Sequence, residues 1–536
     1  MKEAAALVYP KALNLLAVLL GDLVETSRRV SETSGRLEKI GLLAELLKRL
    51  AEDEIAIVVL YLTGELPQGR IGVGWSAVRN ATPKTAADTP SLNLLDVDRS
   101  FDAIAGTTGR GSAADRALIL HRMLARGTQE EQTFLTRLIM GELRQGALEG
   151  VMVEAVAKAS EVPARTVRRA FMFSGDLGAV AQTALTGGAA GLERIGIQLF
   201  RPIKPMLAQT AESVTEVLER LETAAFEFKL DGARVQAHKR GEDVRIFTRR
   251  LNDVTDAVPE IGERVRALPA GEIILDGETL ALRPDGSPQP FQTTMRRFGR
   301  RLDVAAMREE LPLTTFFFDC LYLDGASWVD RPADERYQAL SSVVPSDQLV
   351  PRRVTAEPEE AASFEHQALG AGHEGLMAKA LDTPYEAGGR GRSWLKVKRA
   401  HTLDLIVMAA EWGSGRRRGW LSNLHLGARD PATGEPVMLG KTFKGMTDET
   451  LEWQTKRLQE LETSRDRWTV YVRPELVVEI AFNNIQASPQ YPAGFALRFA
   501  RVKGYRSDKS PKEADTVDAV RAIYEASLGA SKGSTD

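Results

Sequence analysis

The nine residues from 226 to 234, Phe-Glu-Phe-Lys-Leu-Asp-Gly-Ala-Arg, constrain the fold of this 536-residue chain more than any other stretch. Apolar side chains occupy every second position, and Glu227 and Lys229 stand between them. This two-residue period predicts a strand that turns its apolar side chains into a core. Glu227 and Lys229 are therefore expected together on the opposite face.

The same stretch predicts a hairpin with a reactive amine at its mouth. Asp231-Gly232 is a turn pair, and residues 233–239 read as a second strand that runs back along the first. A protonated lysine is a poor nucleophile, but neighbouring cations would lower the pKa of Lys229 and let its amine attack a phosphorus or carbonyl centre. The pattern Lys-x-Asp-Gly alone also fits a surface hairpin with a solvated lysine, so the remaining motifs must decide.

Composition limits the class of protein. The length predicts two to four domains. A net charge of -3 conceals basic runs at residues 296–301 and 416–418, which suit phosphate contacts as well as solvated surface. Cys320 is the only cysteine, so neither a disulfide framework nor a cysteine-based zinc site is expected.

Targeting signals are weak. Residues 12–20 are apolar and superficially suggest a signal peptide, but Pro10 interrupts the segment and no clean cleavage site follows, so a helix or an extended start is preferred. No later apolar span reaches the length of about twenty residues that crosses a membrane. We expect a cytoplasmic protein of a prokaryote, associated with the nucleoid.

The motif Lys229-Leu-Asp-Gly-Ala-Arg234 resembles the nucleotidyl-lysine motif of ATP-dependent DNA ligases, a branch of the covalent nucleotidyltransferases that also holds RNA ligases and mRNA capping enzymes. The resemblance implies that Lys229 carries AMP and that Arg234 lies in the nucleotide pocket. NAD-dependent bacterial ligases share this motif but carry a four-cysteine zinc module, which a chain with one cysteine cannot build. Further motifs follow in family order over about residues 30–515.

Residues 1–195 are expected to form an all-helical, DNA-binding domain. Leucines and isoleucines recur at helical spacing from residue 37 onward, and Thr128-Gln-Glu-Glu131 predicts a capping box. The glycine- and arginine-bearing loops 66–74 and 141–146 resemble segments of the N-terminal DNA-binding domain of the larger ligases. Arg144 and Gly146 are therefore expected to contact the duplex backbone near a nick.

Residues 201–401 resemble the α+β, ATP-grasp-like nucleotidyltransferase domain of the family, and residues 201–208 resemble its start. The resemblance implies that Glu227 accepts a hydrogen bond from the adenine amino group, which guanine lacks at that position. It also implies that Phe318 stacks on the purine. Phe316 and Phe317, in the same apolar run, remain open as core residues.

A second set of residues is implied to handle ribose, metal and phosphates. Arg249 corresponds to the arginine that contacts the ribose or the nicked strand, and Glu278 to the acidic residue near the ribose and the divalent metal. Glu374 is implied as a second metal ligand. The cations implied to meet the phosphates are Arg390, Lys396 and Lys398. Lysines 396 and 398 alternate with apolar residues, so both project from one face of a strand.

Residues 402–527 predict a small barrel, because short strand-like runs are separated by glycine- and proline-bearing turns. The resemblance implies an OB-fold whose Arg506 and Lys509 reach the β- and γ-phosphates of ATP. Residues 528–536 look like a disordered tail.

The sequence therefore predicts a monomeric ATP-dependent DNA ligase that uses Mg²⁺ or Mn²⁺ to seal nicked duplex DNA, with no zinc and no membrane partner. Both DNA replication and DNA repair are compatible with it. Two alternatives stay open: an RNA ligase or GTP-using capping enzyme, and a non-catalytic DNA-binding scaffold of ligase shape. The helical domain disfavours the former, and the retained Lys229, Glu278, Glu374 and Lys396 disfavour the latter.

Overall fold

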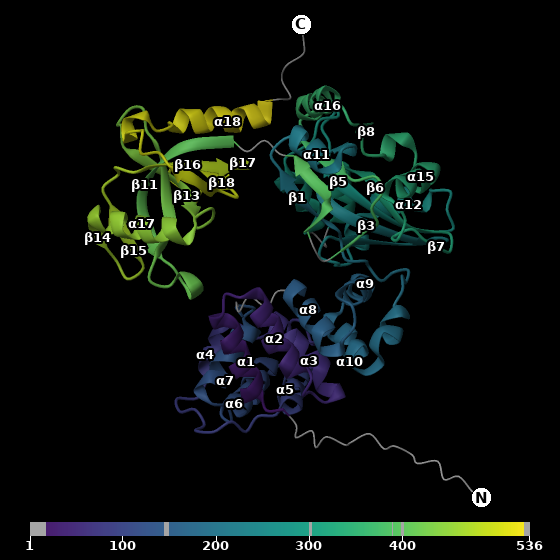
Figure 1. The fold of residues 1–536 in the computed structure, drawn as a ribbon, viewed down its shortest axis with the longest axis vertical. Coiled ribbons are helices and arrows are strands. Elements are labelled where there is room, and N and C mark those ends of the chain that lie inside the picture. The colour runs from purple at the N-terminus through teal and green to yellow at the C-terminus, as the bar shows by residue number, and fades with distance from the viewer. Residues whose placement is uncertain (1–17, 144–148, 300–302, 388–389, 398–400, 530–536) are drawn as a thin grey trace, which may run out of the picture. The chain divides into compact units, whose positions relative to one another are not determined.

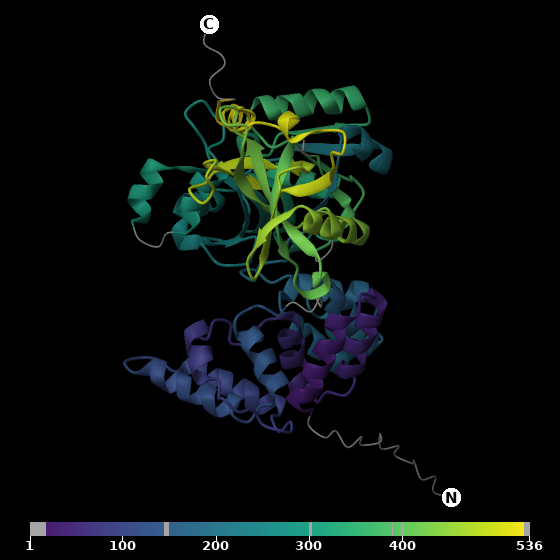
Figure 2. The same cartoon turned by 90° about the vertical axis from the view of Figure 1, so that its left-hand side faces the viewer.

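The computed structural model describes residues 18–143, 149–299, 303–387, 390–397 and 401–529, and the chain divides into two compact units. The first unit comprises residues 1–207 with the short segments 249–251 and 386–389, and the second comprises the rest. Helices build the first unit, and sheets with covering helices build the second (Figure 1, Figure 2).

The first unit follows the helical periodicity of the sequence. Its helices are α1 (Leu20–Glu32), α2 (Arg36–Leu47), α3 (Glu52–Thr63), α4 (Trp75–Ala81), α5 (Leu94–Gly106), α6 (Ser112–Leu124), α7 (Gln129–Ile139), α8 (Glu149–Ser160), α9 (Ala164–Ser174) and α10 (Leu177–Glu193). The predicted capping box of α7 is confirmed: the Glu131 N–H donates to Thr128 Oγ1 (3.3 Å), and the Thr128 N–H donates to Glu131 Oε2 (2.8 Å). None of the described helices is long and apolar enough to cross a bilayer.

The middle domain contains two five-stranded sheets. The first has the order β1-β10-β9-β2-β8 and consists of β1 (Leu207–Ala211), β10 (Arg390–Val397), β9 (Leu376–Lys379), β2 (Ala224–Phe228) and β8 (Arg352–Thr355). The second has the order β4-β3-β5-β6-β7 and consists of β4 (Asp243–Thr248), β3 (Ala233–Arg240), β5 (Glu272–Ala281), β6 (Leu313–Leu323) and β7 (Ala326–Ser327). Helices α12 (Pro259–Arg266) and α15 (Ala333–Val343) pack against the second sheet.

One face of the first sheet forms a core with α11 (Val214–Leu221) and α16 (Pro358–Gly370), which lie side by side (Figure 1). Phe226, Ala378 and Leu395 belong to this core and are fully buried. The strand period of two then turns the intervening residues of β2, β9 and β10 to the opposite face. As expected, Phe226 and Glu227 lie on opposite faces of one strand.

The predicted hairpin between residues 226 and 239 is wrong. Strands β2 and β3 follow one another in sequence, but β2 pairs with β8 and β9 in the first sheet, and β3 pairs with β4 and β5 in the second. The short Asp-Gly connection therefore carries the chain from one sheet to the other. Lys229 lies at this crossing rather than at the mouth of a hairpin.

The C-terminal domain is rich in β-structure. Its strands are β11 (His401–Trp412), β12 (Leu421–Arg429), β13 (Pro436–Thr442), β14 (Glu462–Arg465), β15 (Thr469–Val472), β16 (Val477–Phe482), β17 (Asn484–Ala487), β18 (Phe495–Arg498) and β19 (Arg501–Tyr505). Helices α17 (Asp448–Glu460) and α18 (Val517–Gly529) accompany them. Seven of these strands form one sheet. Five follow the order β13-β12-β11-β15-β14, and the other two join at β11, where β16 pairs with β11 and β19 pairs with β16. Within the described residues these strands do not close into a barrel.

Candidate active site

Lys229 follows β2 directly, and its backbone is held by the loop that precedes β9. Its N–H donates to the carbonyl of Gly375 (2.9 Å), and its own carbonyl accepts from the N–H of Glu374 (3.1 Å). The Nζ atom lies 2.5 Å from Glu374 Oε2, and the two side chains are only 19% and 22% exposed. The backbone of Lys229 is thus held on both sides by hydrogen bonds, and its side chain remains partly exposed.

The structure contradicts the expectation that cations lower the pKa of Lys229. Burial does lower it, but the negative charges of Glu374, Glu278 and Asp231 outweigh burial, so the pKa lies above that of an ordinary lysine. The reason is that carboxylates, rather than cations, are the nearest charged groups in the protein alone. Without a bound cation beside it, the amine therefore stays protonated at neutral pH.

Gly232 is required for a different reason than the turn that the sequence predicts. Its φ angle is not in the left-handed region, so the conformation does not demand glycine. A Cβ atom built there would lie 2.3 Å from the carbonyl oxygen of Thr279, on β5. Only glycine lets the chain pass this close to the second sheet, and the passage brings Lys229 next to Glu278.

Glu278 and Glu374 are the acidic residues near Lys229 that could hold a hard cation. Glu278 and Glu374 both act on the amine, and burial raises the pKa of Glu278 to about 7 despite the nearby charges of Lys229 and Arg234. Within the described part of the chain, no group of three or more histidine, cysteine or acidic residues forms a cage. Two carboxylates without a cage suit Mg²⁺ or Mn²⁺, which complete their coordination with water and substrate phosphates.

A polar and aromatic recess lies on the same face of the first sheet. Glu227 is 3% exposed and pairs with Lys379, whose Nζ lies 2.7 Å from Glu227 Oε2 and donates to the carbonyl of Phe318 at 2.9 Å. The Lys379 ammonium lies 4.7 Å from the ring centroids of both Phe318 and Trp394. A small cavity lined by Ala225, Glu227, Phe318, Asp319, Ala333, Tyr337, Arg352 and Lys379 opens here.

The aromatic run of β6 divides as its strand period requires. Phe317 is 1% exposed and belongs to the core of the second sheet. Phe316 and Phe318 are half-buried on the other face, where they pack with Leu230. The Phe318 ring meets the Trp394 ring edge-on at 6.0 Å, and of the three phenylalanines of this run Phe318 is the one that lines the recess.

Arg234 and Lys396 reach this region from different sheets. Arg234, on β3, lies opposite Glu278, on β5. Lys396 lies opposite Met377, which in turn lies opposite Glu227, so the three form a row across β10, β9 and β2. Residues in such a row project from the same face. Lys396 is thus placed on the face that carries the Glu227 carboxylate.

The other predicted site residues of the middle domain are either exposed or outside the described part of the chain. Arg249 is exposed in the turn after β4. Arg390 begins β10, but its side chain, like the whole of Lys398, lies outside what the structure describes. Arg144 and Gly146 also lie outside the described residues.

In the C-terminal domain the two predicted phosphate cations share one carboxylate. Arg506 Nη1 lies 2.9 Å from Asp404 Oδ2, and Lys509 Nζ lies 2.6 Å from the same oxygen. Asp404, on β11, is 8% exposed. Arg506 also donates to Asp508, from Nε at 2.9 Å and from Nη2 at 2.7 Å. The two cations are therefore gathered into one cluster that remains about one-third exposed.

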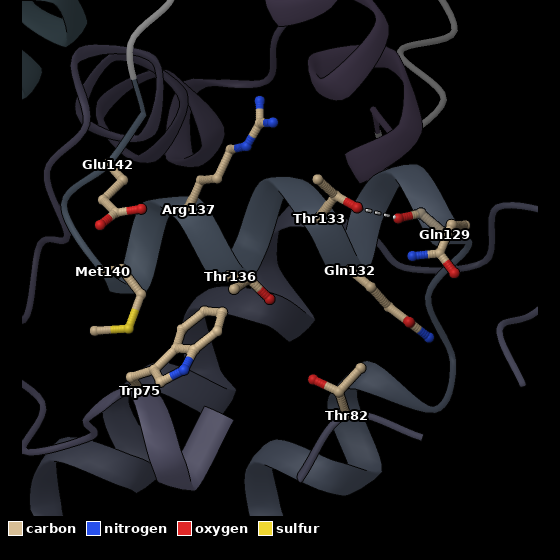
Figure 3. Close-up of a pocket in the computed structure, with 9 residues that line it drawn as sticks. All are labelled: Trp75, Thr82, Gln129, Gln132, Thr133, Thr136, Arg137, Met140 and Glu142. Atoms are coloured by element: carbon tan, nitrogen blue, oxygen red, sulfur yellow. Dashed lines mark hydrogen bonds between the residues drawn. The ribbon is translucent and has the colours of Figure 1, made fainter. Parts of the chain in front are cut away.

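The helical unit carries a hollow of about 260 Å³ between α4 and α7 (Figure 3). Trp75, which directly follows the glycine-rich loop 66–74, is 60% exposed and turns its ring into the hollow beside Met140. Arg137 and Glu142 also line it, together with threonine and glutamine side chains. Loop 66–74 therefore leads to this hollow, and Glu142, in the described part of loop 141–146, lines it.

Sequence patterns did not identify several residues of the site. Lys379 and Trp394 lie in segments that the motifs cover, but no motif predicts that they pair across β9 and β10. Asp276 and Tyr385 hold Arg234 through hydrogen bonds. Their only signal in the sequence was proximity to Glu278 and Arg390, which does not specify a contact.

The chain is similar to known protein families along most of its length. The family described as "DNA ligase N terminus" matches residues 76–157, "ATP dependent DNA ligase domain" matches residues 205–398, and "ATP dependent DNA ligase C terminal region" matches residues 417–509. The three matches follow the order of the helical, middle and C-terminal parts of the structure.

Whole-chain relatives agree. A "Probable DNA ligase" of Anaeromyxobacter sp. (strain Fw109-5) is 58% identical over 516 residues, which cover 96% of this chain and 99% of that protein. A "Probable DNA ligase" of Mycolicibacterium gilvum (strain PYR-GCK) is 55% identical over 511 residues, covering 95% of this chain and 99% of the relative. The solved structure named "Pmar-Lig_Pre." is similar in fold, with a TM-score of 0.60 at 20% identity over 90% of this chain and 99% of that one.

Proposed function

This chain belongs to the ATP-dependent DNA ligase family, and we propose that it seals nicks with a 5′-phosphate and a 3′-hydroxyl in duplex DNA through a lysyl-AMP intermediate. One observation carries the proposal most strongly. Lys229 is fixed between the two sheets, with Glu374 at 2.5 Å and Glu278 nearby, on the sheet face that carries the recess between Glu227 and Phe318. The nucleophile, the carboxylates and the aromatic wall of the recess thus belong to one region of the middle domain.

In the first transfer, the Lys229 amine loses a proton and attacks the α-phosphorus of ATP. A nitrogen–phosphorus bond forms, the bond from the α-phosphorus to the bridging oxygen breaks, and pyrophosphate leaves. Glu374, already within hydrogen-bond distance of Nζ, is the nearest acceptor for that proton. A divalent cation held by Glu278 and Glu374 would supply positive charge beside the phosphates.

The next two transfers move AMP to DNA and then release it. The 5′-phosphate at the nick attacks the lysyl-AMP phosphorus, which restores the lysine and leaves an adenylated DNA end. The 3′-hydroxyl then attacks the 5′-phosphorus, the phosphodiester forms and AMP departs. Each step exchanges one phosphorus bond for another, so positioning and charge stabilisation provide most of the acceleration.

The recess supports adenine as the base. Phe318 offers a flat apolar face, and stacking of one base on one aromatic ring contributes about 1–3 kcal/mol. Glu227 is buried, and its ion pair with Lys379 fixes the direction of its carboxylate. Its carboxylate accepts from the adenine amino group, where guanine presents a carbonyl instead.

The other two domains bind DNA and the outer phosphates of ATP. Residues 1–195 bind the duplex, with Arg144 and Gly146 on its backbone, and residues 201–401 carry the chemistry. Residues 402–527 act as an OB-fold whose Arg506 and Lys509 meet the β- and γ-phosphates, and the enzyme works as a monomer. The match of residues 76–157 to a DNA ligase N terminus favours DNA over a capping or RNA-ligase substrate.

A nick-sealing assay tests the proposal. Purified protein is incubated with a 5′-phosphorylated nick and ATP, GTP or NAD in parallel, and sealing is expected with ATP alone. With labelled ATP, Lys229→Ala should acquire no protein-bound AMP, whereas the exposed-lysine control Lys503→Ala should label like the wild type. Label on Lys229→Ala, or sealing that prefers GTP or NAD, would remove the assignment.

A further inference from the structure

A buried hydrogen-bonded triad joins three segments of the middle domain. Arg234 Nη2 donates to Asp276 Oδ2 at 2.7 Å and to the Tyr385 hydroxyl oxygen at 3.1 Å. The Tyr385 hydroxyl in turn donates to the same Asp276 oxygen at 2.6 Å. Asp276 and Tyr385 are 1% and 2% exposed. Three polar groups thus form a closed ring of hydrogen bonds.

Two members of the triad, Asp276 and Tyr385, are separately anchored. Asp276, on β5, also accepts from Gln236 Nε2 at 3.1 Å through its other oxygen. Tyr385 lies between β9 and β10, and its N–H donates to the carbonyl of Val329 at 2.8 Å. Its ring meets the Trp394 ring edge-on at 5.9 Å. The triad therefore ties the segment that leads into β10 to the second sheet.

The triad sets the direction in which Arg234 points. Its guanidinium carbon lies 5.4 Å from the ring centroid of Phe318 and 5.5 Å from that of Trp394. The Arg234 backbone lies opposite Glu278, and the positive charge of Arg234 acts to lower the pKa of the Glu278 carboxyl. Arg234 is thus held between the aromatic wall of the recess and the acidic residues around Lys229.

We propose that Tyr385 is a positioning residue for nucleotide binding: its hydroxyl, together with Asp276, fixes the Arg234 guanidinium against the nucleotide. The inference rests on the proposed function. Two hydrogen-bond partners fix the direction of a planar guanidinium better than one. The tyrosine oxygen adds a contact to that of the Asp276 oxygen, so ATP meets an arginine that is already oriented.

The first test compares Tyr385→Phe with wild-type full-length protein in the self-adenylation reaction. The phenylalanine keeps the ring packing against Trp394 and removes only the hydroxyl. The KM for ATP should rise about three- to ten-fold, the range expected for loss of one hydrogen bond, while kcat changes less than about two-fold. Tyr322→Phe is the matched control, because the Tyr322 hydroxyl donates to Glu272 (2.9 Å) outside the triad and should leave KM unchanged.

An unchanged KM in Tyr385→Phe overturns the proposal. A lower kcat or a smaller active fraction at constant KM also overturns it, because that pattern reports a purely structural tyrosine. Wild-type protein that forms no lysyl-AMP from ATP would instead overturn the proposed function itself.

A second test asks whether Tyr385 acts through Arg234. Arg234→Lys keeps the buried charge that Asp276 needs and loses the planar fork. In that background, Tyr385→Phe should raise the KM for ATP by less than about two-fold further, because the geometry it protects is already gone. Additive effects of the two substitutions on KM would overturn the proposed route through Arg234.

Discussion

Lys229 is protonated in the protein alone because its nearest charged neighbours are carboxylates. Burial lowers the pKa of Lys229, and Glu374 makes the largest contribution that raises it. We therefore expect Glu374→Gln to lower the pKa of Lys229. The free-amine fraction at about pH 8 then rises about tenfold for each unit by which the pKa falls. The measurement is acetylation of Lys229 followed by mass spectrometry over a range of pH, without ATP or metal.

Exposed lysines in the same sample provide the internal reference for this titration. Glu357→Gln, at an exposed glutamate on the N-terminal side of α16, should not move the Lys229 midpoint. A wild-type midpoint below that of the exposed lysines would contradict the ion pair with Glu374.

Glu278 should make stability depend on pH. Its pKa is raised by burial to about 7, above its value in the unfolded chain. The folded state therefore holds the proton more tightly, and stability is lost as pH rises from the unfolded-state pKa to about 7. We expect Glu278→Gln to raise the free energy of unfolding by about 1–3 kcal/mol at about pH 8, with little effect near pH 4.

Thermal or urea unfolding in the presence of a chelator measures this difference. Glu359→Gln, at an exposed position of α16, is the control and should behave like the wild type at both pH values. If Glu278→Gln were neutral or destabilising at the higher pH, the burial of that carboxyl would not be what raises its pKa.

The sequence identified the charged residues of the site but not their partners. Glu227 and Lys229 were expected to lie together, yet each pairs with a residue of the segment 374–379. A local pattern shows which face of a strand a residue occupies, because that depends on a period of two. It does not show which strand lies alongside, because that depends on contacts far apart in sequence.

At the scale of elements, the false hairpin has the same origin. An Asp-Gly pair between two strand patterns predicts a hairpin, but each strand here finds better partners elsewhere. The sequence marks Gly232 as a turn residue. Glycine is required there for another reason, because the Thr279 carbonyl lies too close to leave room for a Cβ atom. The helical unit was easier to predict because helical periodicity and capping are local in sequence.

The core under the first sheet should determine whether the site forms. Phe226 is fully buried between β2 and the helices α11 and α16. Phe226→Ala should lower the stability of this sheet by about 3–5 kcal/mol. Val354→Ala, on the same sheet but 41% exposed, should cost about 0.5 kcal/mol.

Hydrogen exchange resolves this prediction better than global unfolding, because the chain has several domains. In Phe226→Ala, amides of β9 and β10 should lose protection, while amides of the helical unit should not change. Equal loss of protection in both regions would show that the sheet has no core of its own.

At the scale of the molecule, the proposed chemistry draws on parts of the chain that no single motif contains. The nucleophile, the base recess and the acidic residues belong to the middle domain. The cations assigned to the outer phosphates of ATP belong to the C-terminal domain, where Asp404 gathers Arg506 and Lys509 (2.9 and 2.6 Å). Only the first transfer involves those phosphates, so only that transfer should require the cluster.

Lys509→Ala should therefore separate the steps. It removes one of the two cations, and we expect lysyl-AMP formation at limiting ATP to slow by about tenfold, as for the loss of one charge-assisted phosphate contact. Sealing of a nick that already carries AMP contains no outer phosphates and should change less than about two-fold. Lys512→Ala removes an exposed lysine three residues along the chain and should affect neither rate. If Lys509→Ala slowed both reactions equally, the C-terminal cluster would serve DNA rather than ATP.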